Sequence, residues 1–271
     1  ILVNIESYKK CSSAISLQGR EKSVRKSSIR AEYTEAEISK AQKELDVRIA
    51  PFIGKNVAEL NQIFLPNSAK KSKASFPNLA KAMLSLTSNK VLFKNRDLNA
   101  VLKTVRLSNK NKPVENMSFM PVDFEEWCTA KDWKSCGLYN YFTSTALVLF
   151  VFKQHAAGRN VDDSLITFEG AKVLMIPEYA LNHGLQEVWN EVRRLILNNE
   201  LELETVFHAD GKKVVTNNLP SSKFNGIAHL RPGGKNGDDK VTLRTGQQVA
   251  KQRLWLNAGF IADLVTDFTG N

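Results

Sequence analysis

The order of apolar patterns in this sequence predicts an α/β (α+β) fold, with a small helical subdomain followed by a mixed sheet flanked by helices. Two observations support this prediction. Residues 34–94 show mainly the spacing of short amphipathic helices, whereas residues 95–271 alternate between strand-like and helix-like segments. The chain has 271 residues, of which 42% are apolar, so it is large enough to bury a substantial core.

Three short helices are expected in the first part of the chain. The first has apolar side chains at helical spacing and stops before Pro51, and Asn56 is a candidate N-cap for the second. A lysine-rich turn, residues 66–75, precedes the third. The three predicted helices are 33–50, 57–64 and 78–86.

The second part of the chain alternates strands with two longer helices. A hairpin is expected at residues 165–176, where the turn Glu169-Gly170 separates two apolar stretches. The helix 185–197 carries its apolar residues on one face, and a last helix spans 258–268. The other predicted strands are 101–107, 147–152, 201–207, 226–231 and 253–257.

The charge of the chain is basic and unevenly distributed. The formal net charge is +10 and the isoelectric point is about 9.4. Residues 1–113 carry a net +13, residues 114–200 a net −5 and residues 201–271 a net +2. Such an excess of positive charge favours a polyanionic partner. Residues 1–33, which are polar and basic, are expected to form a linker or the tail of a preceding domain.

Cysteine usage and hydropathy indicate the compartment. Cys11, Cys128 and Cys136 form neither a disulfide framework nor a zinc motif, which favours a reducing compartment, the cytoplasm. The longest apolar run is too short to cross a bilayer, so no membrane partner is expected. Because the sequence begins at Ile1 rather than Met, we expect a fragment or a processed product.

Two segments near the end of the chain carry the candidate binding residues. The first is a strand that leads into a glycine-rich basic corner, formed by Arg231, Pro232, Gly233, Gly234, Lys235 and Asn236. Arginine makes the commonest specific contact to guanine in the DNA major groove, and glycines allow close approach of the backbone. The second segment contains Lys251, Gln252, Arg253 and Trp255. The alternatives are an exposed turn for the corner and a core position for the tryptophan.

Several short segments occur in a fixed order along about residues 40–268. They are Ala50–Ile53, Val57–Leu60, Val101–Val105, Glu115–Phe119, Phe124–Glu126, Leu149–Phe152, Met175–Glu178, His229–Pro232 and Leu254–Asn257. Together they resemble the C-terminal half of the Sau-three-AI-type restriction endonucleases, which belong to a superfamily with the mismatch-repair nicking enzyme MutH.

The resemblance implies a restriction-endonuclease-like fold that binds double-stranded DNA. In that family an Asp and the Glu of a Glu-x-Lys motif hold Mg²⁺ at the scissile phosphate, and the lysine stabilises charge or orients the attacking water. Here the matching strand reads Val101-Leu102-Lys103, with valine in place of the glutamate. The resemblance therefore implies a non-catalytic copy of the fold that needs no metal or other cofactor itself, whereas Mg²⁺ is expected for the parent nuclease. Lys103 and Lys110 become candidate phosphate contacts, and the alternatives are an exposed strand lysine for Lys103 and a solvated loop residue for Lys110.

The function expected from the resemblance is that of a C-terminal effector domain of a type II restriction endonuclease similar to those recognising GATC. Its partners would be double-stranded DNA, the catalytic N-terminal domain of the same polypeptide and a second copy in a homodimer. Two alternatives remain open. In the first, the chain is itself a divergent Mg²⁺-dependent nuclease that uses Asp97, Lys103 and Glu115. In the second, it is a dimerisation or scaffold module that uses the acidic middle of the chain, residues 114–200.

Overall fold

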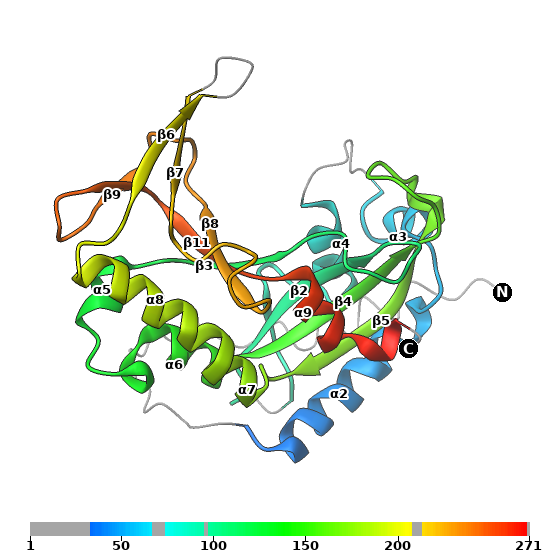
Figure 1. Cartoon of the computed structure of the whole chain (residues 1–271). Coiled ribbons are helices and arrows are strands. Elements are labelled where there is room, and N and C mark those ends of the chain that lie inside the picture. Colours follow the sequence, from blue (N-terminus) through cyan, green and yellow to red (C-terminus); the bar gives the residue numbers. More distant parts are fainter. Residues whose placement is uncertain (1–32, 67–73, 95–96, 208–212, 270–271) are drawn as a thin grey trace.

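The computed structural model describes residues 33–66, 74–94, 97–207 and 213–269. Within these ranges the chain forms a mixed α+β fold in which helices and a second, smaller sheet flank a central mixed sheet (Figure 1). The fold class expected from the sequence, a restriction-endonuclease-like mixed sheet with flanking helices, is confirmed.

The central sheet has the strand order β1-β2-β4-β5. Strand β2 (Ala100–Leu107) runs antiparallel to β1 (Lys90–Val91) and parallel to β4 (Ala146–Gln154), and β5 (Ile166–Leu174) runs antiparallel to β4. All residues of β4 except Lys153 are buried. A nearly continuous apolar run is the pattern of a strand that is covered on both faces.

One face of this sheet is covered by three helices from the N-terminal part, α2 (Glu35–Ile49), α3 (Val57–Phe64) and α4 (Ser75–Met83). Capping boxes start two of these helices. Thr34 with Glu37 caps α2, and Asn56 with Glu59 caps α3, as the sequence suggested for Asn56. The helices share one apolar cluster with β2, β4 and β5.

A second sheet and further helices cover the other face. The sheet has the order β3-β11-β8, all antiparallel, and consists of β3 (Met117–Pro121), β11 (Gln252–Leu256) and β8 (Ala228–Pro232). Its apolar side chains join those of the central sheet and of the surrounding helices in one cluster. These helices are α5 (Phe124–Thr129), α6 (Gly137–Ser144), α8 (Gln186–Leu197) and α9 (Ala258–Leu264).

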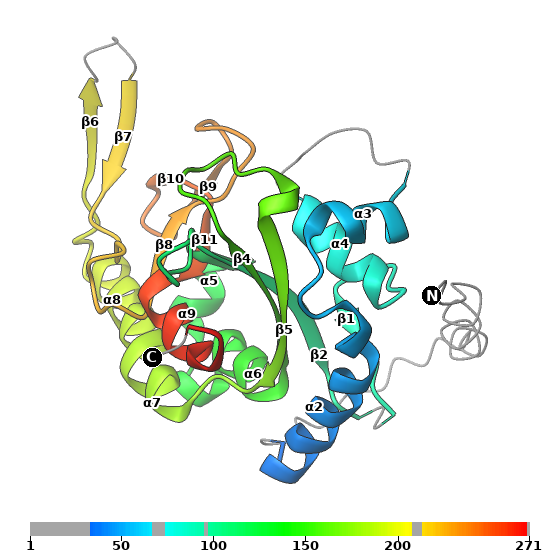
Figure 2. The ribbon, with the colours of Figure 1, turned by 90° about the vertical axis from the view of Figure 1, so that its right-hand side faces the viewer.

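Two hairpins extend this half of the molecule. Strands β6 (Leu203–Phe207) and β7 (Lys213–Asn217) pair with each other and project from the body (Figure 2). Strands β9 (Lys240–Thr242) and β10 (Gln248–Ala250) form the second hairpin, between β8 and β11 in the chain. The short remaining elements are η1 (Ala50–Phe52), η2 (Trp133–Ser135), η3 (Asp163–Leu165), α7 (Glu178–Ala180), the π-helical η4 (Leu181–Leu185) and η5 (Thr266–Phe268).

The expected hairpin at residues 165–176 is wrong, because this segment is the single strand β5. Gly170 lies within the strand at φ +139°, where the register with β4 shifts, and the Phe268 ring would lie 3.0 Å from a Cβ there. The glycine marks a bulge and a close contact instead of a turn.

Other boundaries differ less. The third helix spans Ser75–Met83 instead of 78–86, and the last predicted helix divides into α9 and η5. Residues 1–32 of the predicted linker and most of the lysine-rich turn lie outside the described residues, and the domain boundary at residue 94 stays a prediction. In the part of the chain that the structure describes, no helix is long and apolar enough to cross a membrane.

Candidate nucleic-acid interface

Strand β11 carries the second group of candidate residues and lies in the middle of the smaller sheet. Its side chains alternate between the two faces, so Leu254 and Leu256 are buried in the core while Arg253 and Trp255 are only half-buried on the other face. Strand β8 lies alongside, with Arg231 opposite Arg253. The pairing brings residues about 20 positions apart in the sequence onto one outward face.

Trp255 lies on this outward face and does not belong to the buried core. The guanidinium carbon of Arg231 lies 5.1 Å from the centre of the Trp255 ring. A cation over an indole ring is attracted by the ring quadrupole by roughly 0.5–2 kcal/mol. Trp255 therefore limits the conformations of an arginine that is exposed at the end of β8.

His229 lies on the same face of the sheet as Arg231 and Trp255, but its side chain is buried. It lies opposite Trp255 in the sheet, is 1% exposed, and its Nδ1 is hydrogen-bonded to Asn257 Oδ1. Burial lowers the pKa of His229, and the charge of Arg231 lowers it further. His229 is therefore a core residue of the smaller sheet.

Gly233 controls the position of Arg253. A Cβ at Gly233 would lie 2.4 Å from Arg253 Cγ and 2.7 Å from Cδ, so the arginine stem lies directly against the glycine backbone. The Gly233 N–H donates to Lys251 O at 2.8 Å. Arg253 Nη1 in turn donates to Phe119 O at 2.9 Å. The glycine of the corner is thus needed for close packing of the arginine.

The rest of the corner is organised around Asp239. This carboxylate pairs with Lys251 Nζ at 2.6 Å and accepts from the Lys235 N–H at 3.0 Å, and the Lys251 ammonium lowers the pKa of Asp239. Asn236 Oδ1 accepts from the backbone N–H groups of residues 238 and 239. A Cβ at Gly234 would lie 2.8 Å from Asp239 Cβ. The contacts of Lys251 and Asn236 therefore stabilise the conformation of the loop between β8 and β9.

The other candidate residues are more scattered. Pro232 and Lys235 are exposed at the corner beside Arg231. Gln252 is 2% exposed and its amide donates to Ala250 O at 2.8 Å, so in this conformation it packs inside the fold. Lys110 is exposed in the turn after β2. In the same turn, Asn111 Nδ2 donates a hydrogen bond to Thr269 O near the C-terminal end of the described chain.

Lys103 connects the two sheets. It lies on β2, and its Nζ donates to Ser118 O on β3 at 2.6 Å and lies 4.3 Å from the centre of the Phe119 ring. Burial lowers the pKa of Lys103 to about 8, and the charge of Arg253 adds to the effect. The sequence identified the lysine, but its partners on β3 come from a strand that periodicity alone did not predict.

The residues around Lys103 do not fit the Mg²⁺ site of the resembling nucleases. Val101 shares its face of β2 and pairs with Leu147 on β4, so apolar side chains occupy the position that the resemblance assigns to the glutamate. Magnesium requires oxygen ligands. No group of three or more His, Cys, Asp or Glu side chains within the described ranges could hold a metal ion. Asp97 and Glu115, the alternative ligands, are both exposed.

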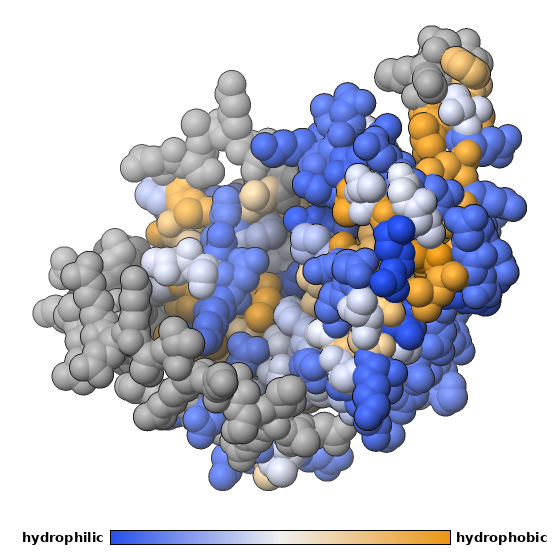
Figure 3. Space-filling view, turned by 90° about the vertical axis from the view of Figure 1, so that its left-hand side faces the viewer, coloured by the Kyte–Doolittle hydropathy of each residue, from blue (hydrophilic) through white to orange (hydrophobic). Residues whose placement is uncertain are grey.

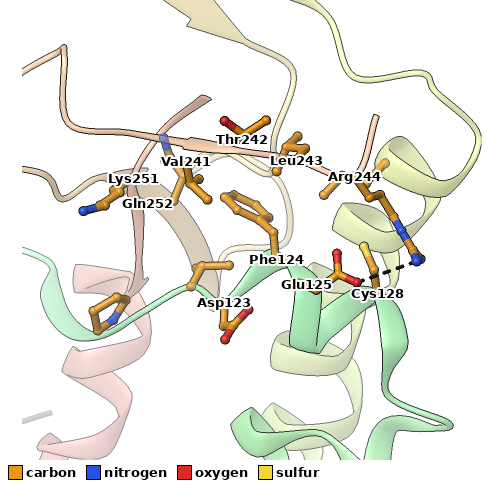
Figure 4. A pocket seen from close by; sticks show the side chains of 13 residues that line it. Asp123, Phe124, Glu125, Cys128, Val241, Thr242, Leu243, Arg244, Lys251 and Gln252 are labelled. Carbon is orange, nitrogen blue, oxygen red and sulfur yellow. Dashed lines mark ion pairs between the residues drawn. The ribbon is translucent and has the colours of Figure 1, made fainter. Parts of the chain in front are cut away.

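A cavity of about 480 Å³ lies behind the corner, between α5, the β9 segment and the start of β11 (Figure 4). Arg244 and Glu125 approach to 3.6 Å at its rim, and Cys128 lines it as a free, buried thiol whose pKa is raised by burial. Lys251 and Gln252 belong to the same lining. The cavity thus adjoins the strand that carries Arg253.

The outward face of β8 and β11 therefore holds Arg231, Arg253 and Trp255, with Lys103 at the junction to the central sheet. No described carboxylate forms a salt bridge with Arg231, Arg253 or Lys103, whereas the nearby Lys251 forms one with Asp239.

Comparison with known proteins gives a related enzyme. The type II restriction enzyme Sau3AI of Staphylococcus aureus is 26% identical over 194 residues.

This chain is related to a restriction endonuclease. The match covers 62% of this chain and 38% of the staphylococcal enzyme, so the chain spans well under half the length of that relative. No protein-family model matches. The relationship agrees with the mixed α+β architecture and with the type of enzyme that the sequence resembles.

Proposed function

We propose that this chain is a sequence-specific double-stranded DNA-binding domain from the C-terminal, MutH-like region of a type II restriction endonuclease. The observation that carries the proposal is the face of β8 and β11, where Arg231 lies on the Trp255 ring with Arg253 beside it and no described carboxylate pairs with either arginine. The relationship to a restriction endonuclease supports the same assignment.

The chemistry of this face suits the reading of bases. A guanidinium presents a planar pair of donors that matches the O6 and N7 acceptors of guanine, and GATC offers one guanine in each half of the palindrome. Because Trp255 already holds Arg231, less conformational entropy is lost on binding. The lysines of the same surface supply attraction to phosphates, which positions the protein without reading sequence.

The proposed role is that of an effector domain, with cleavage performed by the catalytic N-terminal domain of the parent polypeptide. Val101 in the glutamate position and the engagement of Lys103 by Ser118 O support a non-catalytic copy. For the effector role, DNA on this domain must favour a cleavage-competent state of the parent enzyme, which requires different affinities for the two states.

The test is fluorescence anisotropy on a GATC duplex and on a scrambled duplex at several salt concentrations. Wild-type protein should prefer GATC, and Arg231→Ala should remove that preference. Arg159→Ala is the matched control, because it removes one exposed arginine from the loop after β4. Equal binding of both duplexes by the wild type would contradict sequence-specific recognition. Cleavage of plasmid by this chain with Mg²⁺ would contradict the non-catalytic assignment.

A dimerisation module is the second candidate, because the projecting β6–β7 hairpin exposes an apolar surface (Figure 3). Phe207 is 69% exposed and Val215 is 48% exposed, and a two-stranded hairpin gains stability from packing against a partner. Sedimentation with and without duplex distinguishes the roles. A dimer that forms without DNA, is lost in Phe207→Ser and ignores the duplex would favour this candidate.

A further inference from the structure

Two cations hold consecutive carbonyl groups of strand β3. Lys103 Nζ donates to Ser118 O at 2.6 Å from the central sheet, and Arg253 Nη1 donates to Phe119 O at 2.9 Å from β11. The two side chains reach these carbonyls from different strands, β2 and β11, at a point where the register between β3 and β11 shifts. They nevertheless remain close enough for the charge of Arg253 to lower the pKa of Lys103.

Both cations retain unused donors. A lysine ammonium has three N–H donors and an arginine guanidinium has five. Within the described residues, the side-chain hydrogen bond of Lys103 is the one to Ser118 O, and that of Arg253 is the one to Phe119 O. Neither makes a salt bridge to a described carboxylate. The two side chains therefore have donors for an oxygen-rich anion.

Partial burial makes this uncompensated charge unfavourable without a ligand. Lys103 is half-buried over the Phe119 ring, and Arg253 is held in place by the backbone of Gly233. Charged groups taken out of water are stabilised when an opposite charge neutralises them. Arg231 lies opposite Arg253, so the cations form a row from the sheet junction to the corner.

We propose that Lys103 and Arg253 together bind one phosphate group of the DNA backbone at the junction of the two sheets, without a metal ion. The inference rests on the proposed function, since the phosphate belongs to the duplex whose bases Arg231 contacts. Phosphate oxygens accept from both cations, and no bond is made or broken.

Binding should be coupled to protonation of Lys103. An anion stabilises the ammonium form, so the pKa of Lys103 rises when the phosphate is bound. With a pKa of about 8 in the free protein, Lys103 takes up a proton on binding at alkaline pH, and affinity falls as pH rises above that value. The titratable side chain that interacts with Lys103 from the packed strands is Arg253, which stays charged throughout this range.

The experiment compares wild type with Lys103→Met, which keeps the apolar stem, and with Lys103→Arg, which keeps the charge. Lys55→Met is the matched control, since Lys55 is exposed before α3. Thermal unfolding first verifies that each variant is folded. Anisotropy on the GATC duplex then measures affinity against salt and pH, in EDTA and in Mg²⁺.

Lys103→Met should weaken binding about tenfold to hundredfold, as expected for a charge-assisted hydrogen bond. It should reduce the slope of log affinity against log salt by about 1 and remove the decline above pH 8. Lys103→Arg should retain most of the affinity and lose the pH dependence. Wild-type affinity should be the same in EDTA and in Mg²⁺.

Equal affinity and salt slope for wild type and Lys103→Met, with GATC preference intact, would overturn the phosphate site and leave the proposed function standing. Loss of binding in EDTA, restored by Mg²⁺, would also overturn it. If the wild type binds no duplex, the proposed function fails, and calorimetric titration with inorganic phosphate then judges the site. If phosphate binding to the wild type releases heat and Lys103→Met abolishes that heat, the anion site is supported. If the wild type shows no heat of phosphate binding, the anion site is overturned.

Discussion

Gly233→Ala tests whether close packing at the corner positions Arg253 for DNA. The new Cβ would lie 2.4 Å from Arg253 Cγ, 2.7 Å from Cδ and 3.0 Å from Cβ. Carbon atoms in contact prefer roughly 3.5–4.0 Å, so the arginine stem has to move by about 1 Å or more. Because even its Cβ is too close, a change at the guanidinium end alone does not relieve the overlap.

The displacement should have two measurable consequences. Overpacking of this kind costs about 1–3 kcal/mol in the free energy of unfolding, with the lower end expected because a partly exposed side chain can swing outwards. The bond from Arg253 Nη1 to Phe119 O is then lost, and the guanidinium no longer lies in the row with Arg231. Loss of one charge-assisted contact between arginine and phosphate costs about 1.5–3 kcal/mol, which corresponds to about 10- to 150-fold in affinity.

The assay is anisotropy on the GATC duplex together with urea unfolding. Gly237→Ala is the matched control in the same loop, because a Cβ there would meet nothing within 4 Å and the glycine does not need a positive φ. Gly237→Ala should bind like the wild type. If Gly233→Ala also binds like the wild type, Arg253 does not contribute to binding through this packing, and the reasoning about the corner is refuted.

Four further outcomes are expected. Leu149→Ala, at a fully buried position of β4, should lower the free energy of unfolding by about 2–5 kcal/mol in urea titrations, whereas a shift below 0.5 kcal/mol would mean that β4 is not central. Gly184→Ala would place a Cβ 2.6 Å from Ile227 Cγ2 and should lower the free energy of unfolding by about 1–3 kcal/mol. An unchanged melting temperature would argue against this packing. Trp255→Leu should weaken GATC binding about 2- to 30-fold through loss of the cation–π contact, and unchanged affinity would show that Arg231 needs no support. For Lys103, the folded-state pKa of about 8 lies below the ordinary value, so the unfolded chain binds more protons between about pH 8 and 10.5 and stability rises with pH in that window. Unfolding at pH 7.5 and 10 should show this rise in the wild type relative to Lys103→Met, and parallel profiles would contradict it.

Local rules were sufficient for elements whose stability comes from their own pattern. The apolar run at residues 147–152 predicted the strand β4, and Asn56 is the expected N-cap of α3, where the structure adds the contact from Glu59. The apolar face of α8 was equally clear from its spacing. Each of these signals lies within about a dozen residues, so the sequence contains all of the relevant partners.

Local rules failed where a distant partner decides the conformation. Glu169-Gly170 has turn chemistry, but pairing with β4 along its whole length made β5 a continuous strand, and Gly170 instead accommodates the Phe268 ring. Strand β3 has too short an apolar pattern to be predicted alone, and it exists because β11, more than 130 residues later, supplies its hydrogen bonds.

In the candidate interface, too, the sequence determines some features and distant contacts determine the others. The sequence determined that the chain is basic, that Arg231, Arg253, Trp255 and Lys103 are present, and that a valine stands two residues before Lys103. Only the tertiary structure decided that Arg231 lies on Trp255, that Gly233 receives the stem of Arg253, and that Lys103 reaches across to Ser118 O. The reason is physical. Composition and spacing fix which groups are available, whereas strand register and the packing of two sheets fix which of them come within a few ångströms of one another.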